Sequence, residues 1–418
     1  MPLTKLFIDF NSYFASIEQQ ENPKLRGKPV IVVPTDANTT CAIAASYEAK
    51  KLGIRTGTIV GEAKKMCPGL KIVLARHRIY IEYHHKLVET VHTCIPVDMV
   101  RSIDEMSCTL IGKQCQKENA IELAQYIKKT IKEKVGEVIR CSIGIAPNLF
   151  LAKTGTDMQK PDGLVVIEEK DLPQILYKLD LNELYGIGRR MKPRLRLFGI
   201  DTVEKLCAAN KTTLRKVWGG IEGERMYSQL RGEVVQRPPT HRSTIGHSHV
   251  LEPALRTQEG AYGVLNRLVQ KAATRMRYLG YVAGGMYIGV RYIGGKRWHD
   301  DSSFSHTENT TELLRVFDNL WSNRPFDNLK PLAVGVTLFK LLEWDQNTPS
   351  FFEEYDKMRS LNKAVDKLNR LYGSTSVYYA GSQKALKSAP MRIAFTQIPN
   401  LEIEDDEKKI KLIKRKNK

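Results

Sequence analysis

Apolar and polar residues alternate over residues 4–10, TKLFIDF. This period of two predicts a β-strand with its apolar side chains on one face and Asp9 on the other. The next segment, NSYFASIEQQ, has apolar residues at helical spacing, and Asn11 or Ser12 can cap its first turn. The chain therefore opens with a strand and a helix, and an acid lies near their junction.

Short strands and helices alternate to about residue 168. Buried strands are predicted at 28–34 and 139–147, and a β-hairpin is predicted at 97–111. The remaining elements are helices, and they are predicted within 41–53, 62–69, 79–93, 120–136 and 148–163. This order of elements predicts a mixed α and β region.

The second part of the chain has a different pattern. Residues 170–232 are almost purely helical, and 233–242, EVVQRPPTHR, read as a linker because they hold two prolines and have no periodicity. From 243 to 342 the predicted order is strand, long helix, strand, strand, helix, strand, which is typical of a small α+β domain. One more helix is predicted at 356–372, and the basic tail at 408–418 is expected to be disordered. The fold class is thus α+β with several domains.

Composition and charge narrow the function. The net charge of the 418 residues is +19, and residues 237–300 hold ten Lys or Arg against three Asp or Glu, which favours a polyanionic partner such as nucleic acid. No apolar run approaches the roughly 20 residues that span a membrane, and no export signal is expected. The seven cysteines lack CxxC pairs, which favours a reducing compartment. We therefore expect a cytoplasmic, nucleoid-associated protein without a membrane partner.

Asp104 and Glu105 are adjacent in the otherwise apolar or small-residue segment SIDEM. Neighbours on a regular strand point to opposite faces, so either one acid faces solvent or the pair lies at the hairpin turn, where both can converge. With Asp9, they could hold two divalent cations at strand ends of one sheet. Mg²⁺ prefers such oxygen ligands, and a two-metal site suits phosphoryl transfer.

Two further groups of residues suggest phosphate contacts. Tyr47 and Lys50 share one face of a helix, and Lys160 could add a second cation for a triphosphate, although spacing alone does not exclude an ordinary helix surface. Gly186-Ile187-Gly188 joins two predicted helices and precedes Arg189 and Arg190. Glycines there let backbone N–H groups approach a DNA phosphate.

Seven motifs occur in the order and spacing of the Y-family, or translesion, DNA polymerases of the bacterial DinB/UmuC type. They are FIDFNSYFASIEQ, GKPVIVV, SYEAKKLGI, RSIDEM, CSIGIAPNLFLAK, MQKPDG and LYGIGRRM. The chain resembles this family over roughly residues 1–345. The resemblance implies a right-hand fold, with a palm at 1–13 and 75–168, fingers at 14–74, a helix-hairpin-helix thumb at 169–232 and a little finger at 243–342. A linker at 233–242 and a C-terminal extension at 343–418 complete the chain.

The resemblance also implies roles for single residues. The catalytic and metal-binding carboxylates are Asp9, Asp104 and Glu105, with the backbone oxygen of Phe10 as a further ligand. The nucleotide contacts are Tyr13, Phe14, Tyr47, Lys50 and Lys160, of which Phe14 matches the steric gate against ribonucleotides. The expected DNA contacts are Gly186, Gly188, Arg189 and Arg190 in the thumb and Arg242 and Arg291 in the little finger, where Arg267, Lys271, Arg275 and Arg297 are further candidates.

Three positions depart from the family pattern. Lys50 stands where arginine is common; it keeps the positive charge but lacks the guanidinium group that can donate two parallel hydrogen bonds. Ala44 replaces a hydroxyl-bearing residue, and Ser46 is a candidate to supply the missing hydroxyl. Met106 replaces a small residue and is expected to reshape the floor of the site.

The function implied is template-directed, error-prone synthesis across lesions. Two Mg²⁺ ions would join a dNTP to a primer 3′-OH, without proofreading. Primer-template DNA and dNTP are the expected partners of a monomer, and a sliding clamp is a further candidate, although SQKALKS (382–388) is a poor clamp motif. The alternatives are a non-catalytic DNA-binding scaffold of the same fold and a nucleotidyl cyclase, which uses a similar palm.

Overall fold

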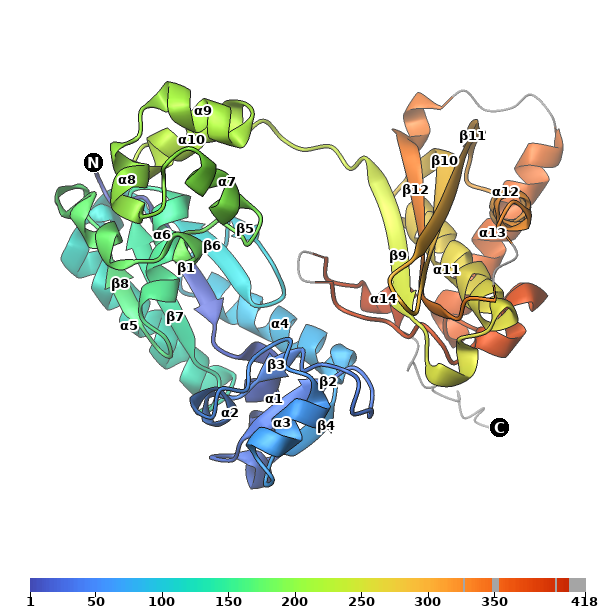
Figure 1. Cartoon of the computed structure of the whole chain (residues 1–418), viewed down its shortest axis with the longest axis horizontal. Helices are drawn as coiled ribbons and strands as arrows, with labels where there is room; N and C mark the ends of the chain where they lie inside the picture. Colours follow the sequence, from blue (N-terminus) through green and yellow to red (C-terminus); the bar gives the residue numbers. More distant parts are fainter. Residues whose placement is uncertain (326–327, 348–352, 395–396, 406–418) are drawn as a thin grey trace, which may run out of the picture. The chain divides into compact units, whose positions relative to one another are not determined.

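The computed structural model describes residues 1–325, 328–347, 353–394 and 397–405. The chain divides into two compact units, one built mainly of Met1–Pro238 and the other mainly of Pro239–Arg392 (Figure 1). The division falls between the two prolines of the segment predicted as a linker. Within the described residues, no helix has both the length and the apolar character that a membrane span requires. All seven cysteines are free thiols. The predicted disorder of 408–418 concerns residues outside the described ones.

A five-stranded sheet is the centre of the first unit, and its strand order is β5-β6-β1-β7-β8. The strands are β1 (Lys5–Phe10), β5 (Met99–Val100), β6 (Glu105–Thr109), β7 (Cys141–Ala146) and β8 (Leu164–Val166). The central strand β1 runs antiparallel to β6 and β7, and Asp9 lies directly opposite Glu105. The predicted strands at 4–10 and 139–147 and the hairpin are thus confirmed.

The helices of this region include α1 (Tyr13–Glu21), α4 (His77–His92), α5 (Lys117–Lys134) and α6 (Leu149–Met158). Helix α6 begins where the Asn148 side chain accepts the Leu151 N–H. It packs closely on β1 and β7, because Gly144 leaves room for its backbone: a Cβ at Gly144 would lie 1.9 Å from the Ala152 carbonyl oxygen. This close approach sets the position of α6 over the sheet.

Replacing Gly144 with alanine is expected to destabilise the first unit, because the methyl group meets backbone that has no room to give way. Overpacking of this kind costs about 1–3 kcal/mol or more. Urea unfolding should show a lower free energy of unfolding than for the parent. Gly69→Ala is the matched control, since a Cβ there meets nothing within 4 Å. Equal stability of the two variants would contradict the close-packing interpretation.

A smaller subdomain follows α1 in the sequence. Its three-stranded sheet has the order β3-β2-β4, with β2 at Val30–Val33, β3 at Ala44–Ala45 and β4 at Lys71–Leu74. Helices α2 (Tyr47–Lys51) and α3 (Val60–Met66) belong to the same small hydrophobic core. Helix α1 is tied to the start of α4 by the buried carboxylate of Glu18, which accepts two hydrogen bonds from Arg76 and one from the Tyr80 hydroxyl.

The last part of the first unit is helical, as predicted, with 3₁₀ turns at Gln174–Lys178 and Leu181–Glu183. The helices are α7 (Met191–Leu197), α8 (Val203–Ala208), α9 (Lys211–Trp218) and α10 (Ile221–Leu230). Their buried leucines share one hydrophobic cluster with Phe150 of α6 and Phe7 of β1. The Asn148 amide also donates hydrogen bonds to the carbonyl oxygens of Gln229 and Glu233. This helical part is therefore packed onto α6.

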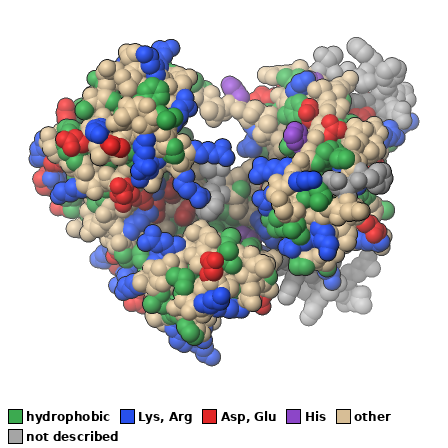
Figure 2. All heavy atoms as spheres, viewed as in Figure 1, with side chains coloured by type: hydrophobic (Ala, Val, Ile, Leu, Met, Phe, Trp, Pro, Cys, Tyr) green, Lys and Arg blue, Asp and Glu red, His purple; other side chains and the backbone are tan. Residues whose placement is uncertain are grey.

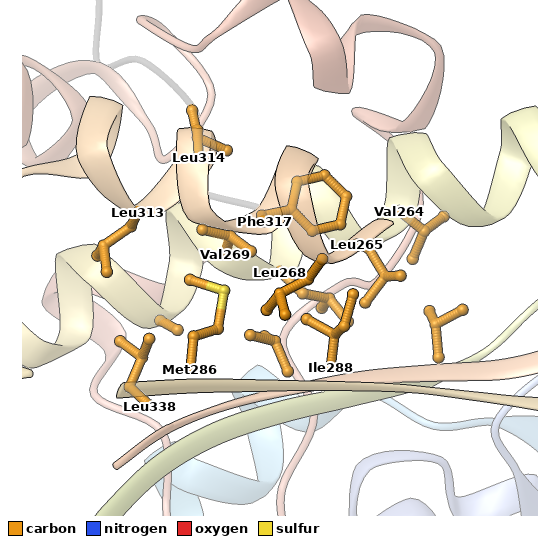
Figure 3. Close-up of a cluster of buried hydrophobic side chains, with 14 of the residues drawn as sticks. Val264, Leu265, Leu268, Val269, Met286, Ile288, Leu313, Leu314, Phe317 and Leu338 are labelled. Atoms are coloured by element: carbon orange, nitrogen blue, oxygen red, sulfur yellow. The ribbon is translucent and has the colours of Figure 1, made fainter. Parts of the chain in front are cut away.

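The second unit is an antiparallel sheet of order β11-β10-β12-β9. Its elements are β9 (Thr244–Val250), α11 (Gln258–Tyr278), β10 (Tyr281–Tyr292), β11 (Arg297–Thr307), α12 (Thr310–Ser322) and β12 (Pro331–Glu343), in the predicted order. Phe317 and Leu268 from the helices pack against Met286 and Ile288 of the sheet (Figure 3). Beyond the sheet, α13 (Glu353–Tyr372) confirms the predicted helix at 356–372, and α14 covers Leu401–Glu404.

Candidate active site

Asp9, Asp104 and Glu105 come together at one end of β1 and β6. Asp9 and Glu105 are directly opposite across the two strands, which places them on the same face of the sheet. Asp104 precedes β6, and its backbone carbonyl accepts the Phe10 N–H at 2.9 Å. The acid pair therefore lies at the hairpin turn, the second of the two alternatives that the sequence left open.

Lys153 of α6 lies between two of these acids. Its ammonium nitrogen is 2.5 Å from Asp9 Oδ2, 2.8 Å from Glu105 Oε1 and 3.3 Å from Asp157 Oδ2. Lys160 extends the cluster, with its Nζ 3.0 Å from Asp9 Oδ1 and 2.7 Å from Asp157 Oδ1. The sequence interpretation missed Lys153 and Asp157, although their spacing of four residues on a predicted helix was a usable signal.

Asp104 has a different environment. The Ser102 hydroxyl donates a hydrogen bond to its Oδ1 at 2.6 Å. Burial raises the pKa of the Asp104 carboxyl to about 6, and the charges of Asp9 and Glu105 act in the same direction. A cation that binds there at acidic pH has to compete with a proton.

The three carboxylates fit divalent metal ions by their chemistry, although their side chains are not arranged around one point. Among the described residues, no group of three or more His, Cys, Asp or Glu side chains is placed to hold a metal ion. The three carboxylates do not converge because the Lys153 ammonium lies between Asp9 and Glu105, while the Asp104 carboxylate accepts a hydrogen bond from Ser102. Hard carboxylate oxygens are the ligands that Mg²⁺ prefers, and a cationic group already stands between two of them.

The predicted nucleotide contacts lie beside this cluster. The Lys50 ammonium donates to the Ser12 hydroxyl at 2.7 Å and lies 4.4 Å from the centre of the Tyr47 ring. Burial lowers the pKa of Lys50, and the nearby Lys160 ammonium lowers it further. The structure thus brings Tyr47, Lys50 and Lys160 to one place next to Asp9. Ser12 is the N-cap residue of α1, one of the two predicted candidates, but its backbone φ is 49° and its side chain makes no capping hydrogen bond.

Two of the three departures from the family pattern receive a structural answer. The Ser46 hydroxyl accepts the N–H groups of Val30 and Ala49 and donates to the Lys28 carbonyl, so it cannot replace the hydroxyl missing at Ala44. The expectation that Met106 reshapes the floor of the site is wrong. Met106 is fully buried opposite Ile8, and both lie on the face of the sheet away from Asp9.

Phe14 lies on α1 with its ring stacked on Tyr80, at 4.5 Å between centroids and 19° between planes. It is 7% exposed. Tyr13 is held more firmly, since its hydroxyl donates to the Tyr80 carbonyl at 2.7 Å. Tyr80 thus supports both aromatic residues from α4.

The glycine turn of the helical part is exposed to solvent. Gly186 has φ +87°, a conformation that favours glycine, and the neighbouring Ile187 is buried in the helical core. Arg189 and Arg190 are exposed and form no ion pair with any residue that the structure describes. The turn is therefore anchored in the core by Ile187, and both arginine side chains are accessible to solvent.

In the second unit, Arg242 and Arg291 are exposed, and Arg291 lies directly opposite Arg297 across β10 and β11. Lys and Arg side chains are numerous on the visible surface of both units (Figure 2).

Three of the other predicted DNA contacts in the second unit are not on an open face. Arg267 and Arg275 are buried, the Lys271 ammonium donates to the Ala389 carbonyl, and all three belong to α11. Because the 3₁₀ turn at Ala380–Ala385 and helix α14 pack on α11, these side chains serve the fold.

The weak clamp motif at 382–388 is also part of this packing. Ser382 and Ala385 are buried, and the 3₁₀ turn at Ala380–Ala385 rests against α11. A short peptide that binds a clamp has to be accessible, and these two positions are not. The structure thus argues against this segment as a clamp contact.

Several known proteins are similar to this chain in sequence. Residues 8–157 match the impB/mucB/samB family, and residues 242–350 match the C-terminal domain of that family. The chain is 31% identical over 389 residues to DNA polymerase IV of Moorella thermoacetica, covering 90% of this chain and 95% of that relative. It is 27% identical over 418 residues to DNA polymerase IV 1 of Bacillus subtilis, covering 96% of this chain and 97% of the relative.

Solved structures show the same architecture. A Y-family DNA polymerase chimera of Dbh and Dpo4 matches 81% of this chain and 99% of its own, with a TM-score of 0.70 at 24% identity. DinB from Sulfolobus solfataricus matches 81% of this chain and 98% of its own, with a TM-score of 0.53 at 26% identity. The chain therefore belongs to the impB/mucB/samB family, which is the Y-family of translesion DNA polymerases that includes DNA polymerase IV.

Proposed function

We propose that this chain extends a primer 3′-OH with the dNTP that a template strand selects, and that it does so across damaged templates. The observation that carries the proposal is the meeting of Asp9, Asp104 and Glu105 at one end of β1 and β6, beside the cations of Lys50 and Lys160. Carboxylates for metal ions and cations for a triphosphate are the two parts that nucleotidyl transfer requires.

We assign the parts of the structure to the domains of a right-hand polymerase. The five-stranded sheet and its helices would be the palm (1–13 and 75–168), and the three-stranded subdomain would be the fingers (14–74). The helical part would be the thumb (169–232), followed by the linker (233–242) and the little finger (243–342). Residues beyond 342 would form an extension, of which α13 and the 3₁₀ turn at Ala380–Ala385 pack on the little finger.

Asp9, Asp104, Glu105 and the backbone oxygen of Phe10 would hold two Mg²⁺ ions. When bound, these ions would supply charge stabilisation for the attacking oxygen and the leaving pyrophosphate. The protein contributes the rigid frame, since Asp9 and Glu105 are in register on paired strands and the Phe10 N–H ties Asp104 to β1. Tyr47, Lys50 and Lys160 would orient the triphosphate, and Phe14 would exclude a ribose 2′-OH.

DNA would be held mainly through its phosphates, by the thumb turn and by the open face of the little-finger sheet. On that face, the alternation along β10 places Gly285, Gly289 and Arg291 outward, while Met286 and Ile288 point into the core. The Phe339 ring covers Gly285 and the Tyr287 ring lies beside Gly289, so the charged side chains rather than the glycines would make the contacts. Arg291 and Arg297 would pair with phosphates. Such contacts would make binding independent of base sequence.

Neutralising Arg189 and Arg190 together is expected to flatten the salt dependence of primer-template binding. Each phosphate contact that is lost lowers the slope of log K against log salt by about one, so the double alanine variant should lose one to two units. Fluorescence anisotropy at several salt concentrations measures this slope. An Arg225→Ala variant is the control, because Arg225 already pairs with Glu222. An unchanged slope in the double variant would remove the thumb turn from the DNA interface.

Primer extension tests the function directly. The purified chain, supplied with Mg²⁺ and dNTPs, should extend a primer on an undamaged template and across a panel of defined lesions. Release of a cyclic nucleotide without extension would favour the cyclase alternative, and DNA binding without extension would favour the scaffold.

We further propose that the protein acts as a monomer on cellular DNA, in the cytoplasm close to the nucleoid. A sliding clamp, if it binds, has to contact a segment other than 382–388.

A further inference from the structure

The ammonium group of Lys153 occupies the most crowded point of the candidate active site. Lys153 is only 6% exposed, yet its Nζ contacts three carboxylates, those of Asp9, Glu105 and Asp157. Together with Lys160, these groups form a closed ring of ion pairs, in which Asp9 and Asp157 each contact both lysines. Asp9 and Lys160 have roles in the proposed chemistry, whereas Lys153 and Asp157 have none.

Electrostatics explains why a cation is needed at this point. Asp9 and Glu105 are directly opposite on adjacent strands, and like charges in that position repel each other. Removing one partner of a buried ion pair leaves an uncompensated charge in a medium of low dielectric constant, which is strongly destabilising. In a protein without metal ions, Lys153 therefore keeps the two carboxylates together.

The same contacts place Lys153 in competition with a metal ion. A divalent cation that binds Asp9 and Glu105 needs the oxygen atoms that the ammonium now contacts. Helix α6 cannot move away easily, because its backbone rests on Gly144. The flexible lysine side chain can move, and Asp157 lies one helical turn further along, 3.3 Å from Nζ, as a partner on which the ammonium can remain.

We propose that Lys153 is a built-in counter-ion that holds the metal-binding carboxylates in place until magnesium arrives, and that Asp157 receives the displaced ammonium. Lys153 is thus a positioning residue, and the affinity for the first metal ion is set by the exchange of one cation for another. The inference rests on the proposed function, because it takes Asp9 and Glu105 as metal ligands.

Two substitutions should change metal affinity in opposite directions. Lys153→Met removes the competing charge and keeps most of the side-chain volume, so manganese should bind at least about tenfold more tightly. Asp157→Asn removes the partner of the displaced ammonium and leaves both lysines more firmly on Asp9, so manganese should bind more weakly. Lys117→Met is the matched control, because Lys117 pairs with Glu168 elsewhere in the same domain. It should leave the affinity unchanged.

The readout is binding of Mn²⁺ to the full chain without DNA or nucleotide, measured by the loss of the free-ion electron paramagnetic resonance signal. Thermal unfolding gives a second readout. In EDTA, Lys153→Met should unfold at a lower temperature than the parent, and added Mg²⁺ should raise its unfolding temperature by more than it raises that of the parent. Lys153→Gln provides a second neutral variant if the methionine variant does not fold.

The outcomes separate the inference from the proposed function. Equal or weaker manganese binding by both neutral variants, or no detectable binding by any of the proteins, would overturn the counter-ion role. That role alone would then fail, provided that the parent chain still extends a primer with Mg²⁺. Absence of extension by the parent would instead remove the proposed function. Tighter binding in Lys153→Met together with weaker binding in Asp157→Asn would establish the exchange.

Discussion

Asp104→Ala should lower the rate of nucleotide addition by at least about a thousandfold, the equivalent of about 4 kcal/mol of transition-state stabilisation. The carboxylate would serve the metal ions, whereas affinity for primer-template comes from basic residues of the thumb and the little finger. Binding of primer-template should therefore stay close to that of the parent. Single-turnover primer extension measures the first quantity, and fluorescence anisotropy measures the second.

The fold should survive this substitution. The Asp104 backbone carbonyl still accepts the Phe10 N–H, because that contact does not involve the side chain. Burial raises the pKa of Asp104 to about 6, above its ordinary value, so the ionised carboxylate lowers the stability of the metal-free protein at neutral pH. That penalty disappears as the pH falls below about 4, where the group is protonated in both states. Metal-free Asp104→Ala is thus expected to unfold at or above the temperature of the parent at pH 7.

A control lies in the same hairpin region. Asp98 is half-exposed and pairs with Lys5, at the end of β1 remote from Asp9. Asp98→Ala removes an acid of the same type and should leave nucleotide addition intact. Normal turnover by a well-folded Asp104→Ala protein would refute the two-metal assignment.

Phe14→Ala should admit ribonucleotides. If the ring packs beneath the sugar of the incoming nucleotide, a 2′-OH overlaps it, and overlap in a packed site is heavily penalised. The preference for dNTP over rNTP, expressed as the ratio of the two kcat/KM values, should fall by at least about ten- to a hundredfold, or about 1.4–2.8 kcal/mol. Addition of dNTP should continue, although more slowly, because the sugar is positioned less firmly.

Stability has to be separated from selectivity in this variant. Phe14 is nearly buried on Tyr80, and removing a buried phenylalanine ring costs about 3–5 kcal/mol. Phe14→Leu retains most of the packing and should show an intermediate preference. Tyr13→Phe is the matched control, since it removes only a hydroxyl that bonds to the Tyr80 backbone. If folded Phe14 variants reject ribonucleotides as the parent does, Phe14 is a packing residue and Tyr13 becomes the next candidate for the gate.

Much of the architecture follows from local patterns in the sequence. The alternation over residues 4–10 corresponds to β1, and the order of elements after residue 243 corresponds to the second unit. Both can be read from the chain because periods of 2 and 3.6 residues record which side chains a strand or a helix buries. The two prolines at 238 and 239 likewise mark the division between the units. The position of Asp104 at a turn was one of two alternatives, and only the folded hairpin decided between them.

Long-range contacts were not available from these patterns. Lys153 and Asp9 are 144 residues apart, and their ion pair exists because Gly144 lets α6 approach the sheet. The use of the Ser46 hydroxyl, the burial of Arg275 beneath the C-terminal segment and the position of Met106 behind the sheet depend in the same way on packing between distant segments. Periodicity reports which face of an element is buried, but it does not report what covers that face. Local patterns therefore specify the elements and the acids of the site, whereas packing between distant segments specifies which cations those acids meet.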